Sequence, residues 1–149
     1  MTDEQDFVVP EYHDQHFYDC FEPVFEAGAK LSDVAYYADI ECGFIEIIKL
    51  DFIHEDASFP IYIKVNLDFD TIEIHDHFPE MDTGYRSFIP QTFWNEVLGN
   101  CLTWVWKMRN QQGYVDGIQF EFHNNIIIQI MGLASQLTTM RVTKETGIA

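Results

Sequence analysis

The side chains best suited to chemistry are Glu73, His75 and His77, which occupy alternate positions of a short apolar stretch. In a β-strand, alternate side chains project from one face about 6–7 Å apart. Two imidazoles and a carboxylate are competent ligands for zinc or iron. An adjacent strand could supply further ligands: His54, Glu55 and Asp56. We favour a solvent-facing polar strand over a metal site, because a metal site also needs hydrogen bonds that orient its ligands.

Other nucleophiles and acid–base groups have poor surroundings. Cys101 falls on the apolar stripe of a predicted helix, which favours inert burial, and Cys20 and Cys42 have no flanking basic residue to stabilise a thiolate. Asp68 and Asp70 flank a phenylalanine in a predicted turn, where Asp is favoured for local hydrogen bonds. The common serine-hydrolase, phosphate-loop, dinucleotide-binding and zinc-protease motifs are missing from the sequence. We therefore predict a protein without catalytic activity, cofactor or metal.

Charge is distributed unevenly along the chain, whose formal net charge is −17. Residues 1–82 contain 21 Asp and Glu against three Lys, a charge of −18, whereas residues 83–149 contain five Lys and Arg against four Asp and Glu, a charge of +1. A negative field repels nucleic-acid phosphates and membrane surfaces and attracts cationic molecules. We expect a basic protein partner, and neither nucleic acid nor a membrane. Solubility alone is the competing explanation of the charge.

The predicted partner-binding residues are Trp106 and the carboxylates between positions 51 and 82. These carboxylates are Asp51, Glu55, Asp56, Asp68, Asp70, Glu73, Asp76, Glu80 and Asp82. Such crowding of like charge costs stability, and a basic partner would relieve it. Interleaved aromatics could anchor that partner or pack in the core: Phe59, Tyr62, Phe69, Phe78 and Tyr85. For Trp106 we favour burial beside the helix stripe over an exposed anchor.

Hydrophobic periodicity sets the elements that position these groups. Residues 1–10 are predicted to be a flexible acidic arm, and residues 11–26 one or two short helices interrupted by Pro23 and ended near Gly28. The clearest helix is predicted at 90–110, where the apolar residues follow helical spacing: Trp94, Val97, Leu98, Cys101, Val105 and Met108. Strands are predicted at 31–39, 44–54, 61–67, 72–77, 118–122, 126–131 and 136–142, with a bulge near 47–48 and a loop at 79–90.

Helix, strands, helix and strands in that order indicate an α+β fold. We predict a single domain at residues 11–149, with a mostly antiparallel sheet of about five to seven strands and the 90–110 helix packed on it. No apolar run reaches membrane-spanning length and the acidic start is unlike a signal peptide. The three widely spaced cysteines lack a C-x-x-C pair. We therefore expect a soluble cytoplasmic protein with reduced thiols.

The C-terminal third carries a family resemblance. Residues 116–122 (DGIQFEF), a short turn, residues 126–131 and the pair Ala134-Ser135 before a final strand resemble small bacterial immunity proteins of polymorphic or contact-secreted toxin systems. The resemblance implies an acidic cytoplasmic α+β protein that binds and neutralises a cognate toxin, often a nuclease. It assigns no individual residue a role.

Together these observations predict a non-catalytic immunity protein that neutralises a basic toxin acting in the cytosol. Its acidic surface would cover the toxin's basic active site. Three alternatives remain open: a nucleic-acid mimic that inhibits a defence enzyme, a metal-dependent enzyme built on the Glu73, His75 and His77 face, and a structural or oligomeric module with no special partner.

Overall fold

The computed structural model describes residues 11–68, 70–80 and 84–143, with side chains from residue 16 onward, so the predicted arm at 1–10 lies outside the described residues. In the described part, one α-helix and one short 3₁₀ helix accompany nine strands. The elements are α1 (Glu11–Ala27), β1 (Lys30–Asp39), β2 (Ile45–His54), β3 (Ala57–Val65), β4 (Ile72–His75), β5 (Tyr85–Phe88), η2 (Thr92–Glu96), β6 (Leu102–Arg109), β7 (Val115–Phe122), β8 (Ile127–Leu133) and β9 (Gln136–Val142).

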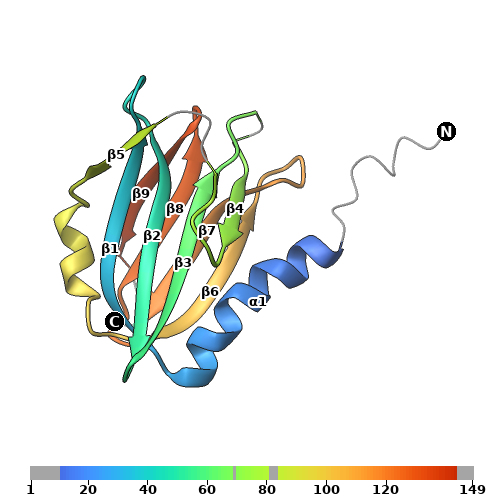
Figure 1. Ribbon diagram of the computed structural model, residues 1–149. Helices are drawn as coiled ribbons and strands as arrows, with labels where there is room; N and C mark the ends of the chain where they lie inside the picture. Colours follow the sequence, from blue (N-terminus) through green and yellow to red (C-terminus); the bar gives the residue numbers. More distant parts are fainter. Residues whose placement is uncertain (1–10, 69, 81–83, 144–149) are drawn as a thin grey trace, which may run out of the picture.

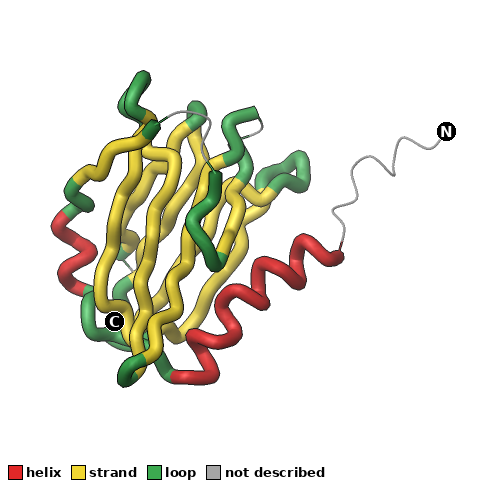
Figure 2. Tube along the Cα trace, viewed as in Figure 1, coloured by secondary structure: helices red, strands yellow, loops and turns green. Residues whose placement is uncertain are grey.

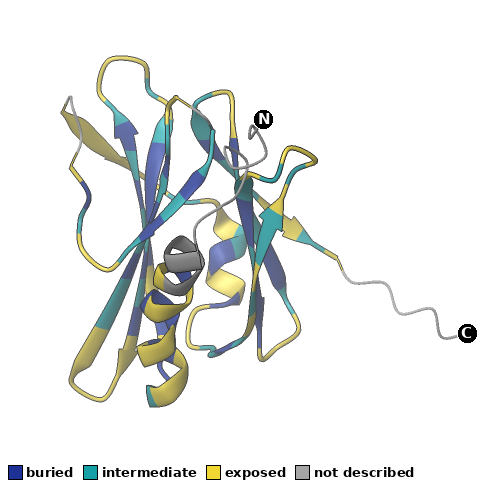
Figure 3. Ribbon diagram, turned by 90° about the vertical axis from the view of Figure 1, so that its right-hand side faces the viewer, coloured by how far each residue is buried: buried dark blue, intermediate teal, exposed yellow. Residues whose placement is uncertain are grey.

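The strands form two antiparallel sheets that face each other (Figure 1, Figure 2). Sheet A has the order β4-β3-β2-β1-β5, and sheet B has the order β6-β7-β8-β9. Figure 3 shows both helices between the sheets, with buried residues lining the inner faces. The α+β single domain is confirmed. The described residues form nine strands, more than the predicted five to seven. They form one α-helix, whereas a second, long helix was predicted.

Helix α1 closes the open edge of the sandwich beside β3 and β4. Phe17, Cys20, Phe21 and Val24 follow helical spacing and are buried in the shared core. Pro23 lies within the helix on its exposed side, so the segment is one helix and not two. The helix ends as predicted: Gly28 has φ 63°, a left-handed conformation that glycine adopts without strain.

A buried polar network joins the sheets at the opposite edge. The indole nitrogen of Trp94 in η2 donates a hydrogen bond of 2.6 Å to the hydroxyl of Tyr36 on β1. The Tyr36 hydroxyl donates in turn to the side-chain oxygen of Gln91 at 2.6 Å and lies 3.1 Å from the hydroxyl of Thr139 on β9. Because Trp94 and Tyr36 are buried, these partners satisfy groups that water cannot reach.

The predicted helix at 90–110 is wrong. Its first part is the 3₁₀ helix η2, the chain then turns at Gly99, where φ is 82°, and the remainder is strand β6. The apolar residues that matched helical spacing therefore lie on different elements. β6 contains Thr, Val and two Trp, residue types that fit an extended, pleated surface.

The predicted strands are confirmed, the one at 136–142 with the predicted ends and the rest with shifted ends. β3 begins at Ala57, earlier than predicted, and β5 occupies part of the predicted loop at 79–90. The irregularity in β2 lies one residue before the expected position: Tyr37 pairs with Ile47 and Ala38 pairs with Ile45, which leaves Glu46 as the extra residue. Among the described residues, no helix has the length and apolar composition needed to span a membrane.

Candidate functional site

Glu73 and His75 lie on the outer face of sheet A, as the strand pattern predicts. β4 pairs with β3 so that Ile72 and Ile74 enter the core, which turns Glu73 and His75 outward. The His75 Nε2 is 3.0 Å from the Glu73 Oε1. This contact is the main cause that lowers the pKa of Glu73 below its usual value of 4.5. The carboxylate is therefore held ionised by its own neighbours.

His77 lies beyond the end of β4, and its Nδ1 is 2.9 Å from the Asp76 Oδ1. The rings of His75 and His77 are 5.7 Å apart. In the part of the chain that the structure describes, no group of three His, Cys, Asp or Glu is placed to hold a metal ion. His54 is too distant to assist, because its pairing partner Ala57 is five residues, roughly 17 Å, along β3 from the position paired with His75.

An aromatic cluster covers the outer face of sheet A beside these residues. Phe78, in the connection that leaves β4, has ring-centroid distances of 5.1 Å to Tyr37, 5.5 Å to Tyr62 and 5.0 Å to Tyr85. These partners belong to β1, β3 and β5, so Phe78 holds the connection against the sheet that it crosses. Lys49 lies over the Tyr62 ring at 5.7 Å. The interleaved aromatics are therefore partly structural. Phe59 packs against the core, and Phe69 lies outside the described residues.

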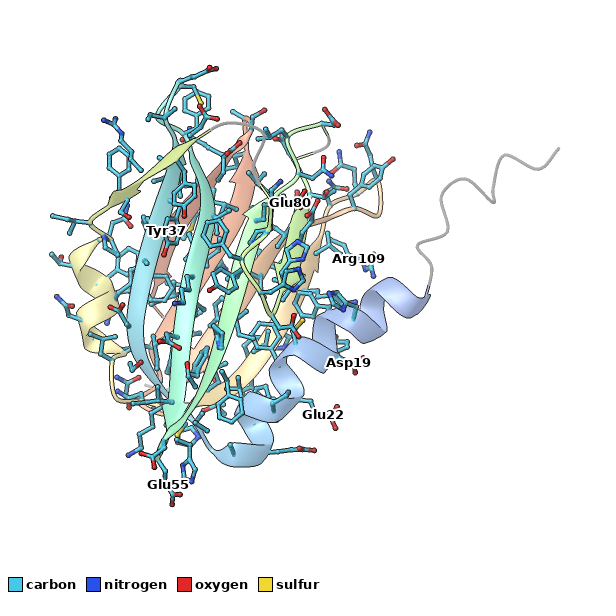
Figure 4. All side chains as sticks on the ribbon, viewed as in Figure 1. Asp19, Glu22, Tyr37, Glu55, Glu80 and Arg109 are labelled. Carbon is cyan, nitrogen blue, oxygen red and sulfur yellow. The ribbon has the colours of Figure 1, made fainter. Side chains whose placement is uncertain are left out.

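The predicted acidic residues do not form one continuous patch. Glu55 and Asp56 form the β2–β3 turn, whereas Asp68 and Asp70 lie in the β3–β4 turn, at the other end of a nine-residue strand roughly 30 Å long. Figure 4 shows this separation for Glu55 and Glu80. Asp51 accepts a hydrogen bond of 2.7 Å from the Ser58 hydroxyl on the same sheet. Asp82 lies outside the described residues.

A smaller acidic group surrounds β4, and we name it the β4 carboxylates: Asp68, Glu73, Asp76 and Glu80. Asp68, Asp76 and Glu80 are exposed, and Glu73 is partly buried. The pKa of Asp76 is lowered, mainly by its contact with His77. Asp68 precedes β4, Glu73 lies on it, and Asp76 and Glu80 follow it, so all four lie on this strand or in the connections at its two ends.

Asp70 has a different position. Its Oδ1 accepts a hydrogen bond of 2.7 Å from the backbone amide of Ser135, in the β8–β9 turn of the opposite sheet. Gly132 on β8 lies so close that an added Cβ would be 2.6 Å from the Asp70 carbonyl oxygen. Asp70 therefore connects the two sheets. This structural contact accounts for an Asp at this position, and no partner molecule has to be invoked.

Trp106 is not buried beside a helix, contrary to the favoured interpretation. It lies on β6 with its side chain on the outer face of sheet B, 41% exposed. Trp104 lies two residues earlier on the same face, 57% exposed, with the two ring centroids 6.4 Å apart. Sequence reasoning missed Trp104 because the helical assignment hid the alternation of Trp104, Val105 and Trp106.

Charge is segregated between the two sheets. The described side chains of α1, of sheet A up to β4 and of their connections, residues 16–80, comprise 15 Asp and Glu against three Lys, a charge of −12. The strands of sheet A themselves contain five acidic and four basic residues, so the excess of negative charge lies on α1 and in the connections. Sheet B contains three basic residues against two acidic ones, a charge of +1: Lys107, Arg109 and Arg141 against Asp116 and Glu121. Figure 4 shows Asp19 and Glu22 on α1 pointing away from the sandwich. The molecule is thus acidic on one side and close to neutral on the other.

The model of a family of unknown function, DUF6334, matches residues 22–146. The chain belongs to this family. No curated protein and no solved structure matches the chain. The DUF6334 region contains both sheets and η2, together with the end of α1 from Glu22. The β4 carboxylates and the exposed Trp pair therefore both lie within the DUF6334 region.

Proposed function

We propose that this chain is a non-catalytic binding protein that neutralises a basic protein, as an immunity protein neutralises its toxin. The observation that carries the proposal is the segregation of charge: α1 and the connections of sheet A hold the negative charge, and sheet B is close to neutral. A one-sided field orients a cationic partner before contact and raises the association rate.

The β4 carboxylates are the proposed docking point for this partner. The exposed Asp68, Asp76 and Glu80 supply charge, and Tyr85, which is 44% exposed at the edge of the aromatic cluster, supplies an apolar anchor. Charge that steers and an aromatic that packs are the two parts of a strong protein interface. Covering a basic active site with carboxylates would block it without any chemical step.

The test takes a basic protein that co-purifies with this chain from its native cell and measures its binding to the chain with Asp68, Asp76 and Glu80 all changed to Lys. We expect the association rate and the affinity to fall at least tenfold, and the dependence of the affinity on salt to weaken. Asp70 is left unchanged because it supports the fold.

A matched control changes Glu22, Glu26 and Glu55 to Lys. These exposed carboxylates lie on α1 and at the far hairpin, and their replacement alters the net charge by the same amount. We expect a clearly smaller loss of affinity. Equal losses in the two variants would mean that only the total charge matters, and unchanged binding in both would overturn the electrostatic mechanism.

A further inference from the structure

The outer face of sheet B is built from three rows of four residues. The register places Trp106, Gln119, Gln129 and Met140 in the central row. The flanking rows are Trp104, Glu121, Ile127 and Val142 on one side and Met108, Gly117, Met131 and Thr138 on the other. We name these twelve residues the Trp–Met face.

Eight of the twelve residues of the Trp–Met face are apolar, and the face carries almost no charge. Its one charged residue, Glu121, is only 6% exposed. The central glutamines are occupied with each other, since the Gln129 amide donates a hydrogen bond of 2.6 Å to the Gln119 side-chain oxygen. Exposed Trp and Met are enriched in protein interfaces, and Trp is among the residues that contribute most to binding.

Neither helix covers the Trp–Met face. Figure 3 shows α1 and η2 between the sheets, and Figure 1 shows them at the two open edges of the sandwich. The equivalent face of sheet A differs, because the connection that contains Phe78 packs on it. The two exposed Trp side chains on sheet B therefore have an outward apolar surface around them in the described structure.

We propose that the Trp–Met face is the interface of a homodimer, in a role separate from the proposed docking at the β4 carboxylates. A second copy fits this face because Trp106 of one copy can face Met140 of the other, and the charge distribution fixes its orientation. Two chains of charge −17 repel each other, and this repulsion is smallest when their nearly neutral sheets B meet while α1 and the acidic connections of sheet A point apart. A basic partner would gain no electrostatic attraction from an uncharged face.

The size of the face suits the centre of such an interface. Four strands about seven residues long cover roughly 440 Å². A standard interface takes about 800 Å² from each partner, so the rim must contribute the remainder. Exposed apolar residues continue the surface at the end that holds the β6–β7 and β8–β9 turns: Tyr114 and Leu133.

The symmetry of the contact follows from the row order. A two-fold axis that runs parallel to the strands within the interface places β6 of one protomer over β9 of its partner. In the central row this sets Trp106 against the Met140 position, and sulfur–aromatic contacts are favourable. Because of the two-fold symmetry, the same Trp106–Met140 contact occurs at both edges of the dimer interface.

The experiment is analytical ultracentrifugation of the full chain over a range of protein and salt concentrations. We expect a reversible dimer whose affinity increases with salt, because salt screens repulsion between the acidic bodies. Binding to a basic partner has the opposite salt dependence, so failure of the dimer and failure of the proposed function are distinguishable. A wild-type chain that stays monomeric at about 100 μM in high salt would overturn the proposal.

Variants localise the contact. Replacing Trp104 and Trp106 together by Ser is expected to weaken dimerisation at least about 30-fold, the threshold for a residue that dominates an interface. The matched control is Ile89→Ser, since Ile89 is 94% exposed outside the Trp–Met face, and its dimer should be unchanged. Fluorescence of the buried Trp94, the one tryptophan left in the double variant, verifies its folding, and circular dichroism verifies the folding of Ile89→Ser. A dimer that is equally stable in the Trp variant contradicts the assignment.

Discussion

The side chain of Asp70 accepts a hydrogen bond from the backbone amide of Ser135 at 2.7 Å, although the two residues lie in turns of different sheets. This contact joins the β3–β4 turn to the β8–β9 turn. Asp70 therefore has a structural role, although its sequence position suggests part of an acidic binding surface.

Replacing Asp70 by Ala should destabilise the fold by about 1–2 kcal/mol, since the partly buried Ser135 amide loses its acceptor. Asp70 also has φ 56°, which Asn tolerates better than Ala. Asp70→Asn keeps a side-chain oxygen and should recover most of the loss. Urea denaturation of the two variants measures this difference, and equal stability of Asp70→Ala and the unaltered chain would contradict it.

Gly132→Ala should be more damaging. The new Cβ would lie 2.6 Å from the Asp70 carbonyl oxygen and 3.1 Å from Val65 Cγ2, and a backbone atom cannot move aside cheaply. We expect a loss of at least about 2 kcal/mol in thermal or chemical denaturation. The control is Gly84→Ala, where the nearest atom to an added Cβ is 3.8 Å away. Similar stabilities for the two variants would show that the turns separate readily.

Tyr36→Phe should cost about 1–3 kcal/mol, because the buried Trp94 indole nitrogen would lose its acceptor. The change removes one oxygen atom and leaves the ring packing intact, so the loss reports on the polar network alone. Tyr85→Phe is the comparison, since Tyr85 is 44% exposed. Denaturation midpoints that shift equally would argue against a structural role of the network.

Glu73→Gln should lower stability by about 0.5–1 kcal/mol at neutral pH, a value discounted for the partial exposure of Glu73. The pKa of Glu73 is lowered in the fold, chiefly by His75, so its carboxylate stabilises the protein above the usual pKa of 4.5. That contribution disappears as the pH falls through the lowered pKa. Denaturation at neutral and at strongly acidic pH tests this, with the exposed Glu80→Gln as the control; a difference that persists in acid would refute it.

Cys20 should react with iodoacetamide much more slowly than Cys42. Burial, and then the negative charges of Asp76 and Asp19, raise the pKa of Cys20 to about 11, so the reactive thiolate is scarce near neutral pH. Cys42 is exposed at the β1–β2 turn. Mass spectrometry of the labelled peptides gives the two rates, and denatured protein, where both should react alike, is the reference. Equal rates in the folded protein would sink this prediction.

The alternating strands were predictable because burial repeats every second residue. In β3, Ile61, Ile63 and Val65 are buried while Tyr62 and Lys64 are not, which is the pattern that periodicity predicts. Helix α1 was predictable for the same reason at helical spacing. Its single-helix character was not, because Pro23 breaks helices in general and this one tolerates it on the exposed side.

The helix predicted at 90–110 was wrong because buried residues of η2 and of β6 together follow helical spacing. Trp94 in η2, Val97 directly after it and Leu102 in β6 are all buried, so their spacing resembles one helical stripe although a turn separates them. Gly99, with φ 82°, and the run of Thr and Trp after it were the signals that favoured a turn and a strand.

The candidate sites were only partly predictable, because residues adjacent in sequence need not be adjacent in space. Glu55 and Asp68 belong to the same acidic stretch of sequence but lie at opposite ends of β3. The exposure of Trp104 and Trp106 on one face could not be predicted without knowing that β6 is the edge strand of sheet B.

Separating the charge of the two sheets gives the molecule a permanent electric dipole moment that points across the sandwich. We expect a single chain to bind an anion-exchange bead by its acidic side, formed by α1 and the connections of sheet A, which leaves sheet B toward the liquid phase.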